Sequence, residues 1–190
     1  ASWGGGEASY QTPTLNALIL AVDFVSMHTY PFHDTHYNPA FWTDTSDEVR
    51  AKDPQAAVSA AMERAAVYAQ NQYVSTKRYV SSVDPGKAIH IGETGWASLD
   101  NGFYGPDGSN AAGERQQQLY FELMIAWARA AGVVLVLFEA FDEPWKDAKN
   151  PAGSENHFGL IDGQNRAKRV LWAELDAGAL HGLTRGGRPI

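Results

Sequence analysis

Three apolar segments, each followed by a helical one, constrain the fold of this chain more than any other feature. The apolar segments are typical of β-strands. Polar loops separate them from the helical segments. The strands cover residues 22–30, 88–93 and 133–139, and the helices cover residues 54–79, 114–131 and 166–175. Strands that alternate with helices are typical of a parallel sheet with crossover helices. We therefore predict an α/β fold with function at the carboxyl ends of its strands.

Composition narrows the classes of function. A chain of 190 residues suggests one domain, or at most two small ones. Its net charge of −7, without a stripe of Lys and Arg, argues against a nucleic-acid partner. No apolar run is long enough for a membrane helix, and the absence of Cys excludes thiol nucleophiles and disulfide scaffolds. Six Trp and an aromatic share of 12% favour flat apolar ligands such as sugar rings.

Glu93 is the sharpest candidate for catalysis. It ends an apolar strand and precedes Thr94, Gly95 and Trp96, so its carboxylate is expected beside a large aromatic ring. A carboxylate in that place can act as a nucleophile or as a base. A salt-bridged carboxylate at a strand end is the alternative interpretation.

A second acidic cluster follows the third strand. Glu139, Phe141 and Glu143 share strand parity, so two carboxylates and an aromatic ring could face one cavity. Lys146 could neutralise one carboxylate or donate to a sugar hydroxyl. A solvated network of surface charges is the alternative, and Glu155 is a weaker candidate on its own.

The histidines of the first loop raise the question of a metal site. His28, His33 and His36 lie near Asp34, but no regular element holds them at ligand spacing. We expect hydrogen bonding in this loop and no metal. The chain also lacks a phosphate-binding glycine loop and a Gly-x-Ser-x-Gly elbow, and we expect no cofactor.

Four motifs together resemble glycoside hydrolase family 17, the β-1,3-glucanase family. Residues 91–98, Ile-Gly-Glu-Thr-Gly-Trp-Ala-Ser, resemble its nucleophile strand, with Ala97 where the family usually has Pro. Residues 28–32, His-Thr-Tyr-Pro-Phe, look like the end of the preceding strand. Residues 139–146 are similar to the family's eighth-strand motif, and Glu155 precedes a Phe-Gly-Leu motif at 158–160. The motifs occur in the family's order across nearly the whole chain.

The resemblance implies a (β/α)₈ TIM barrel and retaining chemistry on β-1,3-linked glucose polymers. It makes Glu93 the nucleophile. It assigns the orientation of the sugar and the hydrogen bonds of the site to Tyr30, Glu143, Lys146 and Glu155. It also suggests sugar stacking or wall roles for Trp96 and Trp145, and we add His28 and Phe141 as substrate-binding candidates from their strand ends.

One expected residue is absent. The family's general acid/base is a Glu in an Asn-Glu pair at the end of the fourth strand, and this chain contains no such pair. We therefore expect residues 1–190 to be the C-terminal portion of a single catalytic domain, from the end of strand 5 through helix 8. The inward faces of its strands would then be uncovered, at Phe24, Ile89, Ile91, Leu135 and Leu137. Stability would require the missing N-terminal half-barrel or a dimer partner.

The leading hypothesis is thus a laminarinase-like, retaining endo-β-1,3-glucan hydrolase whose acid/base lies outside this chain. A transglycosylase of the same family, a non-catalytic carbohydrate-binding or assembly fragment, and a hydrolase of another polysaccharide remain alternatives. We expect a glucan oligosaccharide or polysaccharide as partner, and neither nucleic acid nor membrane. Because glucan polymers lie outside the cytoplasm, the hypothesis favours an extracellular or periplasmic location.

Overall fold

The computed structural model describes residues 10–36, 53–100 and 111–189, which form one three-stranded sheet, its helices and a small C-terminal hairpin. The N-terminal part contains α1 (Pro13–Ala21), β1 (Phe24–His28), α2 (Pro31–His36) and α5 (Pro54–Val83). The middle contains β2 (Ala88–Gly95), α6 (Glu114–Ala131) and β3 (Leu135–Phe138). The C-terminal part contains the short helices η2 (Ser154–Asn156), η3 (Arg169–Leu171) and α7 (Trp172–Asp176), then the strands β4 (Thr184–Arg185) and β5 (Arg188–Pro189).

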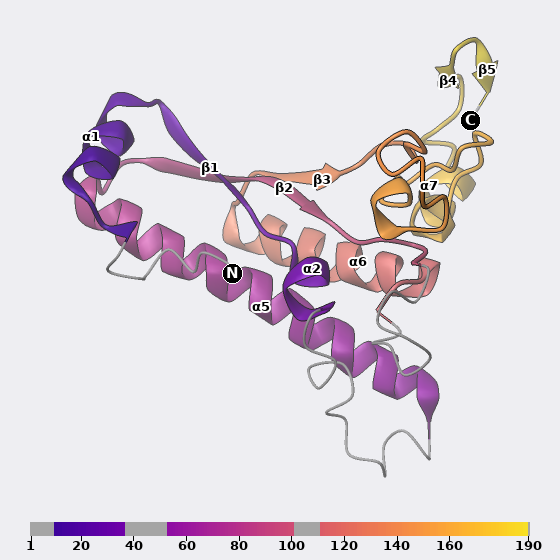
Figure 1. The fold of residues 1–190 in the computed structure, drawn as a ribbon, viewed down its shortest axis with the longest axis horizontal. Helices are drawn as coiled ribbons and strands as arrows, with labels where there is room; N and C mark the ends of the chain where they lie inside the picture. The colour runs from indigo at the N-terminus through magenta and orange to yellow at the C-terminus, as the bar shows by residue number, and fades with distance from the viewer. Residues whose placement is uncertain (1–9, 37–52, 101–110, 190) are drawn as a thin grey trace.

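The sheet is parallel, with the strand order β1-β2-β3. The long helices α5 and α6 lie on one face of the sheet (Figure 1). Because the strands are parallel, their carboxyl ends lie at the same edge of the sheet, where α2 follows β1 and the loops after β2 and β3 begin. This arrangement confirms the prediction of an α/β fold with a parallel sheet.

Local sequence signals set the ends of the helices. The Asp53 side chain accepts a hydrogen bond from the backbone N–H of Gln55, and Pro54 occupies the first turn of α5, where no N–H is needed. Gly132 ends α6 in the left-handed region with φ 65°, which favours glycine. The bounds predicted for α6 are confirmed, whereas α5 continues four residues beyond the predicted end. Helix α1, whose first turn is capped by Thr12, is not apparent from the sequence pattern.

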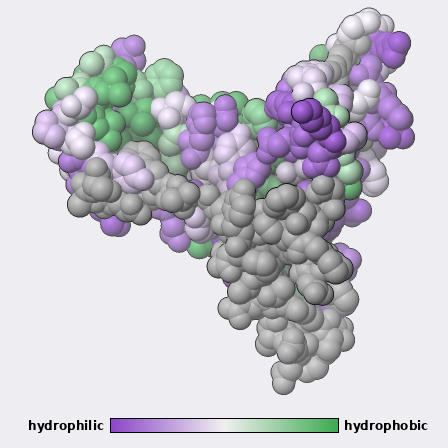
Figure 2. Space-filling view, in the orientation of Figure 1, coloured by the Kyte–Doolittle hydropathy of each residue, from purple (hydrophilic) through white to green (hydrophobic). Residues whose placement is uncertain are grey.

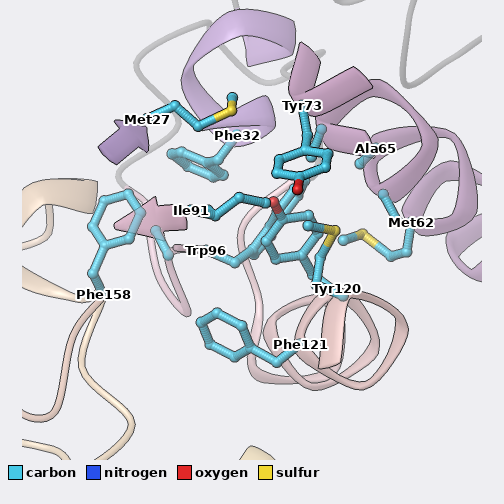
Figure 3. Close-up of a cluster of buried hydrophobic side chains, with 14 of the residues drawn as sticks. Met27, Phe32, Met62, Ala65, Tyr73, Ile91, Trp96, Tyr120, Phe121 and Phe158 are labelled. Carbon is cyan, nitrogen blue, oxygen red and sulfur yellow. The ribbon is translucent and has the colours of Figure 1, made fainter. Parts of the chain in front are cut away.

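The hydrophobic core lies between the sheet and the two long helices (Figure 3). Side chains from the sheet, from α2 and from both helices meet there. The best-buried members include Met27, Phe32, Met62, Ala65, Ile91, Trp96, Tyr120, Phe121, Met124 and Phe158. Removal of this apolar surface from water is the main stabilising contribution to the fold.

The prediction of which side chains lie on the uncovered face of the sheet is partly wrong. Ile89 and Ile91 do not point to the uncovered face, because both are buried on the side of the helices. Leu135 and Leu137 also pack against that core. Phe24, as expected, is exposed. The exposed side chains of the third strand region are instead those of Val136 in β3 and of Val134 just before it, each about half exposed. Strands of parallel sheets are apolar on both faces, so hydrophobicity alone could not decide which face the helices cover.

The uncovered side of the sheet, which we call the open face, is apolar at its amino-terminal end. Phe24, at the start of β1, is about half exposed there. Figure 2 shows a further hydrophobic area over α1, the helix that precedes β1, where Leu18 and Leu20 are exposed. Phe24 stacks on His90 across the two strands, with ring centroids 4.5 Å apart. Gly92 leaves no room on this face, since a Cβ there would lie 1.9 Å from the Ser26 Oγ.

Candidate active site

The carboxyl ends of the three strands bring the predicted residues together. The register of β1 on β2 shifts between Met27 and His28, so that His28 pairs with Glu93 rather than with Gly92. The backbone N–H of Thr29 then donates to the Glu93 carbonyl over 3.0 Å. This irregularity places the side chains that follow β1 beside the carboxylate of β2.

Glu93 is held at one of its two carboxylate oxygens. The Tyr30 hydroxyl donates to Oε2 over 2.9 Å, and Nδ1 of His28 lies 3.2 Å from the same oxygen. Within the described residues no donor reaches Oε1, and the side chain is about one-third exposed. One oxygen is thus anchored while the other remains available to a reacting group.

Tyr30 is built to remain a donor. Burial raises the pKa of its phenol, and the hydrogen bond to Glu93 and the negative charges of Glu93, Glu139 and Glu155 raise it further. The ring is also fixed in place, because Phe138 and Phe158 contact it edge-on at centroid distances of 5.9 and 6.1 Å. The phenol therefore stays protonated across the physiological range and keeps its hydroxyl on Glu93.

Lys146 joins two carboxylates of the acidic cluster. Its Nζ lies 2.7 Å from Glu139 Oε2 and 3.1 Å from Glu143 Oε2, and it sits 4.1 Å from the centroid of the Phe138 ring. Burial lowers the pKa of Lys146, but the hydrogen bonds and charges of the two carboxylates outweigh that effect and raise it above its ordinary value. Burial raises the pKa of Glu139 despite the opposing effect of Lys146. The three groups form a charged cluster rather than a set of separate surface residues.

Two site residues were missing from the predicted set. Glu139 belonged to the acidic cluster but was not assigned to substrate binding, although its side chain is only 12% exposed and touches Lys146. His33 was expected only as a loop residue, yet its Nε2 lies 3.3 Å from Glu155 Oε1 and its ring packs on Tyr30 and Phe158. Glu139 could have been assigned to the site because it lies at the end of a predicted strand. The sequence contains no comparable signal for His33.

A buried ion pair supports the loops around the site. Nζ of Lys168 lies 2.6 Å from Asp142 Oδ1 and 2.7 Å from the Ser98 hydroxyl. Burial lowers the pKa of Lys168, and the attraction of Asp142 opposes this only in part. Asp142 also accepts the backbone N–H of Gly159, where a Cβ would lie 2.1 Å from the Asp142 nitrogen. The segment that carries Phe158 is thereby fixed against the loop after β3.

Three predicted site residues lie elsewhere than expected or stay untested. Trp96 is fully buried, donates from Nε1 to the Ala111 carbonyl and packs between Phe32 and Tyr120, so the expectation that it stacks on a sugar is wrong. Its large ring fills the core below the strand ends. Trp145 lines a separate cavity, away from the Glu93 cluster. Phe141 is half-buried and forms a parallel bridge with Ile161, and its role in binding stays a prediction.

Neither a metal cluster nor a membrane helix is found in the described ranges. Over residues 10–36, 53–100 and 111–189, no three His, Asp or Glu side chains are grouped so that they could hold a metal ion. The helices in those ranges include none that is both long enough and apolar enough to cross a bilayer.

Carboxylates at the ends of parallel strands are compatible with the carboxylate-based glycoside hydrolases, which use a pair of such groups. Comparison with known families agrees, since the family model of the BtgE/BtgC glycoside hydrolase domain matches residues 6–159. The chain belongs to this family. The resemblance to glycoside hydrolase family 17 is thereby confirmed.

Three individual relatives are similar to this chain over part of their length. The structure of an endo-laminarinase from Formosa Hel1_33_131 superposes with a TM-score of 0.83 at 49% identity, covering 100% of this chain and 48% of that one. An active-site mutant of Rhizomucor miehei β-1,3-glucanosyltransferase, solved with laminaritriose, superposes with a TM-score of 0.55 at 21% identity, over 85% of this chain and 46% of that one, which supports the fold. A glucan 1,3-beta-glucosidase from Arthroderma benhamiae is 32% identical over 103 residues, covering 50% of this chain. The chain spans about half the length of the two structures and 32% of the glucosidase.

Proposed function

We propose that this chain is the nucleophile-bearing part of a retaining endo-β-1,3-glucan hydrolase, with Glu93 as the nucleophile. The observation that carries the proposal is the state of Glu93. Tyr30 and His28 hold its Oε2, while no described donor reaches Oε1. The likeness to an endo-laminarinase at 49% identity supports β-1,3-glucan as the substrate.

The reaction then runs in two steps. Oε1 of Glu93 attacks the anomeric carbon, and the bond from that carbon to the bridging oxygen breaks as the oxygen receives a proton from an acid on the opposite side. A water molecule next attacks the anomeric carbon of the glycosyl-enzyme. It gives a proton to the residue that acted as the acid in the first step, and the bond from the sugar to Glu93 breaks. The two carboxyl groups of a retaining enzyme lie about 5–5.5 Å apart. We assign the acid/base to a segment outside this chain.

The other charged residues bind and orient the sugar. Lys146 keeps Glu139 and Glu143 close together, and the Glu143 oxygen that Lys146 does not contact can accept a bond from a sugar hydroxyl, whereas the second oxygen of Glu139 is buried. Glu155, held by His33, supplies another acceptor near Tyr30. Ionised acceptors make the stronger hydrogen bonds to hydroxyl groups.

The open face supports the assignment of this chain to the C-terminal half of a (β/α)₈ barrel, from the end of strand 5 through helix 8. Val134 and Val136 are each half exposed there, and both β1 and β3 are edge strands of the described sheet. The chain also covers only 48% of the endo-laminarinase. We propose that an N-terminal half-barrel covers this face, and that a second copy of this chain does so where that half is absent. An extracellular or periplasmic location follows from the proposed substrate.

A substitution of the nucleophile tests the function. In the protein that carries this chain within a complete barrel, Glu93→Gln should abolish release of reducing ends from laminarin while leaving the binding of laminarin oligosaccharides measurable. Glu174→Gln, the same change at an exposed position of α7, should leave the rate unchanged. ¹H NMR of the first product should show the β-anomer, as retention requires. Hydrolysis by Glu93→Gln at the original rate, or an α-anomer as first product, would overturn the assignment.

The same assay separates hydrolysis from transfer. Products longer than the oligosaccharide supplied would show that a second sugar, rather than water, reaches the intermediate. No residue named above distinguishes the two outcomes, since both use the same nucleophile.

A further inference from the structure

A cavity lies beside the turn that carries Lys146. It has a volume of about 370 Å³ and is lined by residues from three segments: the turn itself, residues 163–165 and the hairpin of β4 and β5. The side chains that matter are those of Trp145, Asn165 and Arg188. None of the residues that contact Glu93 or Lys146 through their side chains lines this space. We call it the Trp145 pocket.

The indole of Trp145 is unusual for a residue of its size. It is 62% exposed, and among the described residues it makes no hydrogen bond and no ring contact. Trp is normally at least partly covered, because its large apolar ring gains most from burial. The neighbouring residue Lys146 is turned the other way, toward Glu139 and Glu143. An uncovered flat ring at the wall of a cavity offers a surface on which another flat group can stack.

The other lining groups are donors and an amide. Arg188 makes no ion pair with a described carboxylate, and its guanidinium offers several N–H groups in one plane. Asn165 adds one acceptor and two donors, and its backbone is held in the left-handed region at φ 65°. The carboxylate of Asp142, which also borders the pocket, is already paired with Lys168.

This chemistry fits a neutral sugar better than other ligands. A wholly apolar ligand would leave Arg188 and Asn165 desolvated without partners, which is unfavourable. A strongly anionic ligand would meet Asp142 and a chain with a net charge of −7. A pyranose ring has one apolar face for Trp145 and equatorial hydroxyls for the amide and the guanidinium. The volume lies at the lower end of the range for small-molecule sites, which suits a short stretch of saccharide.

We propose that the Trp145 pocket is a second saccharide-binding site, separate from the Glu93 cluster, that holds a stretch of the glucan being cleaved. The identity of the sugar rests on the proposed function. The pocket and the proposed reaction site adjoin in the sequence, because Trp145 lines the pocket and the next residue, Lys146, belongs to the charged cluster. A polymer bound at both is held at a high effective concentration near Glu93. The pocket therefore acts on long substrates and not on short ones.

The test uses the protein that carries this chain within a complete barrel, with laminarin and laminaritriose as probes. The variants are Trp145→Ala, Asn165→Gly and Arg188→Ala. Glycine keeps the left-handed backbone at position 165 while removing the amide. The matched control is Trp172→Ala, which removes another exposed Trp, 52% exposed, from α7. Binding is measured by retardation in native gels that contain laminarin, and the thermal unfolding midpoint of each variant verifies its fold.

We expect Trp145→Ala to weaken laminarin binding by about tenfold, as loss of one aromatic contact implies, and Trp172→Ala to leave it unchanged. Asn165→Gly and Arg188→Ala should raise KM for laminarin severalfold without changing turnover of laminaritriose. Unchanged retardation in all three variants of a protein that still cleaves laminarin would overturn the pocket alone. A wild-type protein that neither binds nor cleaves laminarin would overturn the proposed function, and the glucan site with it.

Discussion

Replacement of Lys146 by Met tests whether the acidic cluster is held together by its one cation. The substitution keeps an unbranched side chain, one atom shorter, and removes the charge that lies 2.7 Å from Glu139 and 3.1 Å from Glu143. All three side chains are less than one-third exposed, so water screens the interaction only partly. A hydrogen bond to a charged group contributes about 1.5–3 kcal/mol, which corresponds to a loss in kcat/KM of roughly 10- to 150-fold.

The pH dependence gives the sharper result. Lys146 lowers the pKa of Glu139, which burial already raises, so removal of the cation should raise that pKa further. If sugar binding needs the ionised carboxylate, the acid limb of kcat/KM on laminarin moves to higher pH, and the loss is largest in acid. Lys149→Met is the control, because Lys149 is exposed and lies outside the cluster. A profile of kcat/KM against pH that is the same for Lys146→Met and Lys149→Met would refute the reasoning.

Two further predictions follow from single contacts. Tyr30→Phe removes the 2.9 Å hydrogen bond to Glu93 and should lower kcat/KM on laminarin by about 10- to 100-fold. Because burial and Glu93 raise the pKa of Tyr30, the hydrogen bond of the wild type should persist up to at least pH 10. A Tyr30→Phe variant as active as the wild type would contradict the role of this hydrogen bond. Lys168→Met removes the cation from the buried Asp142, whose carboxylate then keeps, among the described residues, the Gly159 N–H and His157, 3.5 Å away; it should cost up to about 3–5 kcal/mol in the free energy of unfolding, measured by denaturant titration. Arg166→Met breaks an exposed pair, with Arg166 71% exposed, and should cost no more than about 1 kcal/mol; equal losses in the two variants would refute this contrast.

The regular elements were predictable because their signals are local. Asp53 followed by Pro54 predicts where α5 begins, and Gly132 predicts where α6 ends. The parallel pairing followed from the alternation of strands with helices. By contrast, the side of the sheet that the helices cover depends on tertiary packing. Ile91 and Val136 are similar apolar residues, yet one is fully buried and the other is half exposed.

The sequence identified residues of the candidate site better than it identified which of them contact one another. The strand end at Glu93 and the motif that contains Tyr30 identified two residues that the structure brings into direct contact. The register shift before His28, which sets that contact, leaves no mark in the pattern of hydrophobic residues. Trp96 was misassigned because an aromatic residue after a strand fits a sugar platform and a core residue equally well. Its burial depends on α6, which lies at a distance in the sequence.

Glu93, its two anchors and the acidic residue after β3 come from three adjacent strands, and this has a consequence for how such proteins can be recombined. The ladder of backbone hydrogen bonds fixes the lateral spacing of those strands at about 4.8 Å, whatever segment supplies the opposite side of the cleft. The proposed nucleophile and the groups that hold it are therefore kept together in this one chain. A chimera that joins this chain to the first half of a related barrel would keep the surroundings of Glu93 and, under the proposed function, take its acid from the other protein. Exchange of halves would then be a route to new pH optima and cleavage patterns without redesign of the nucleophile.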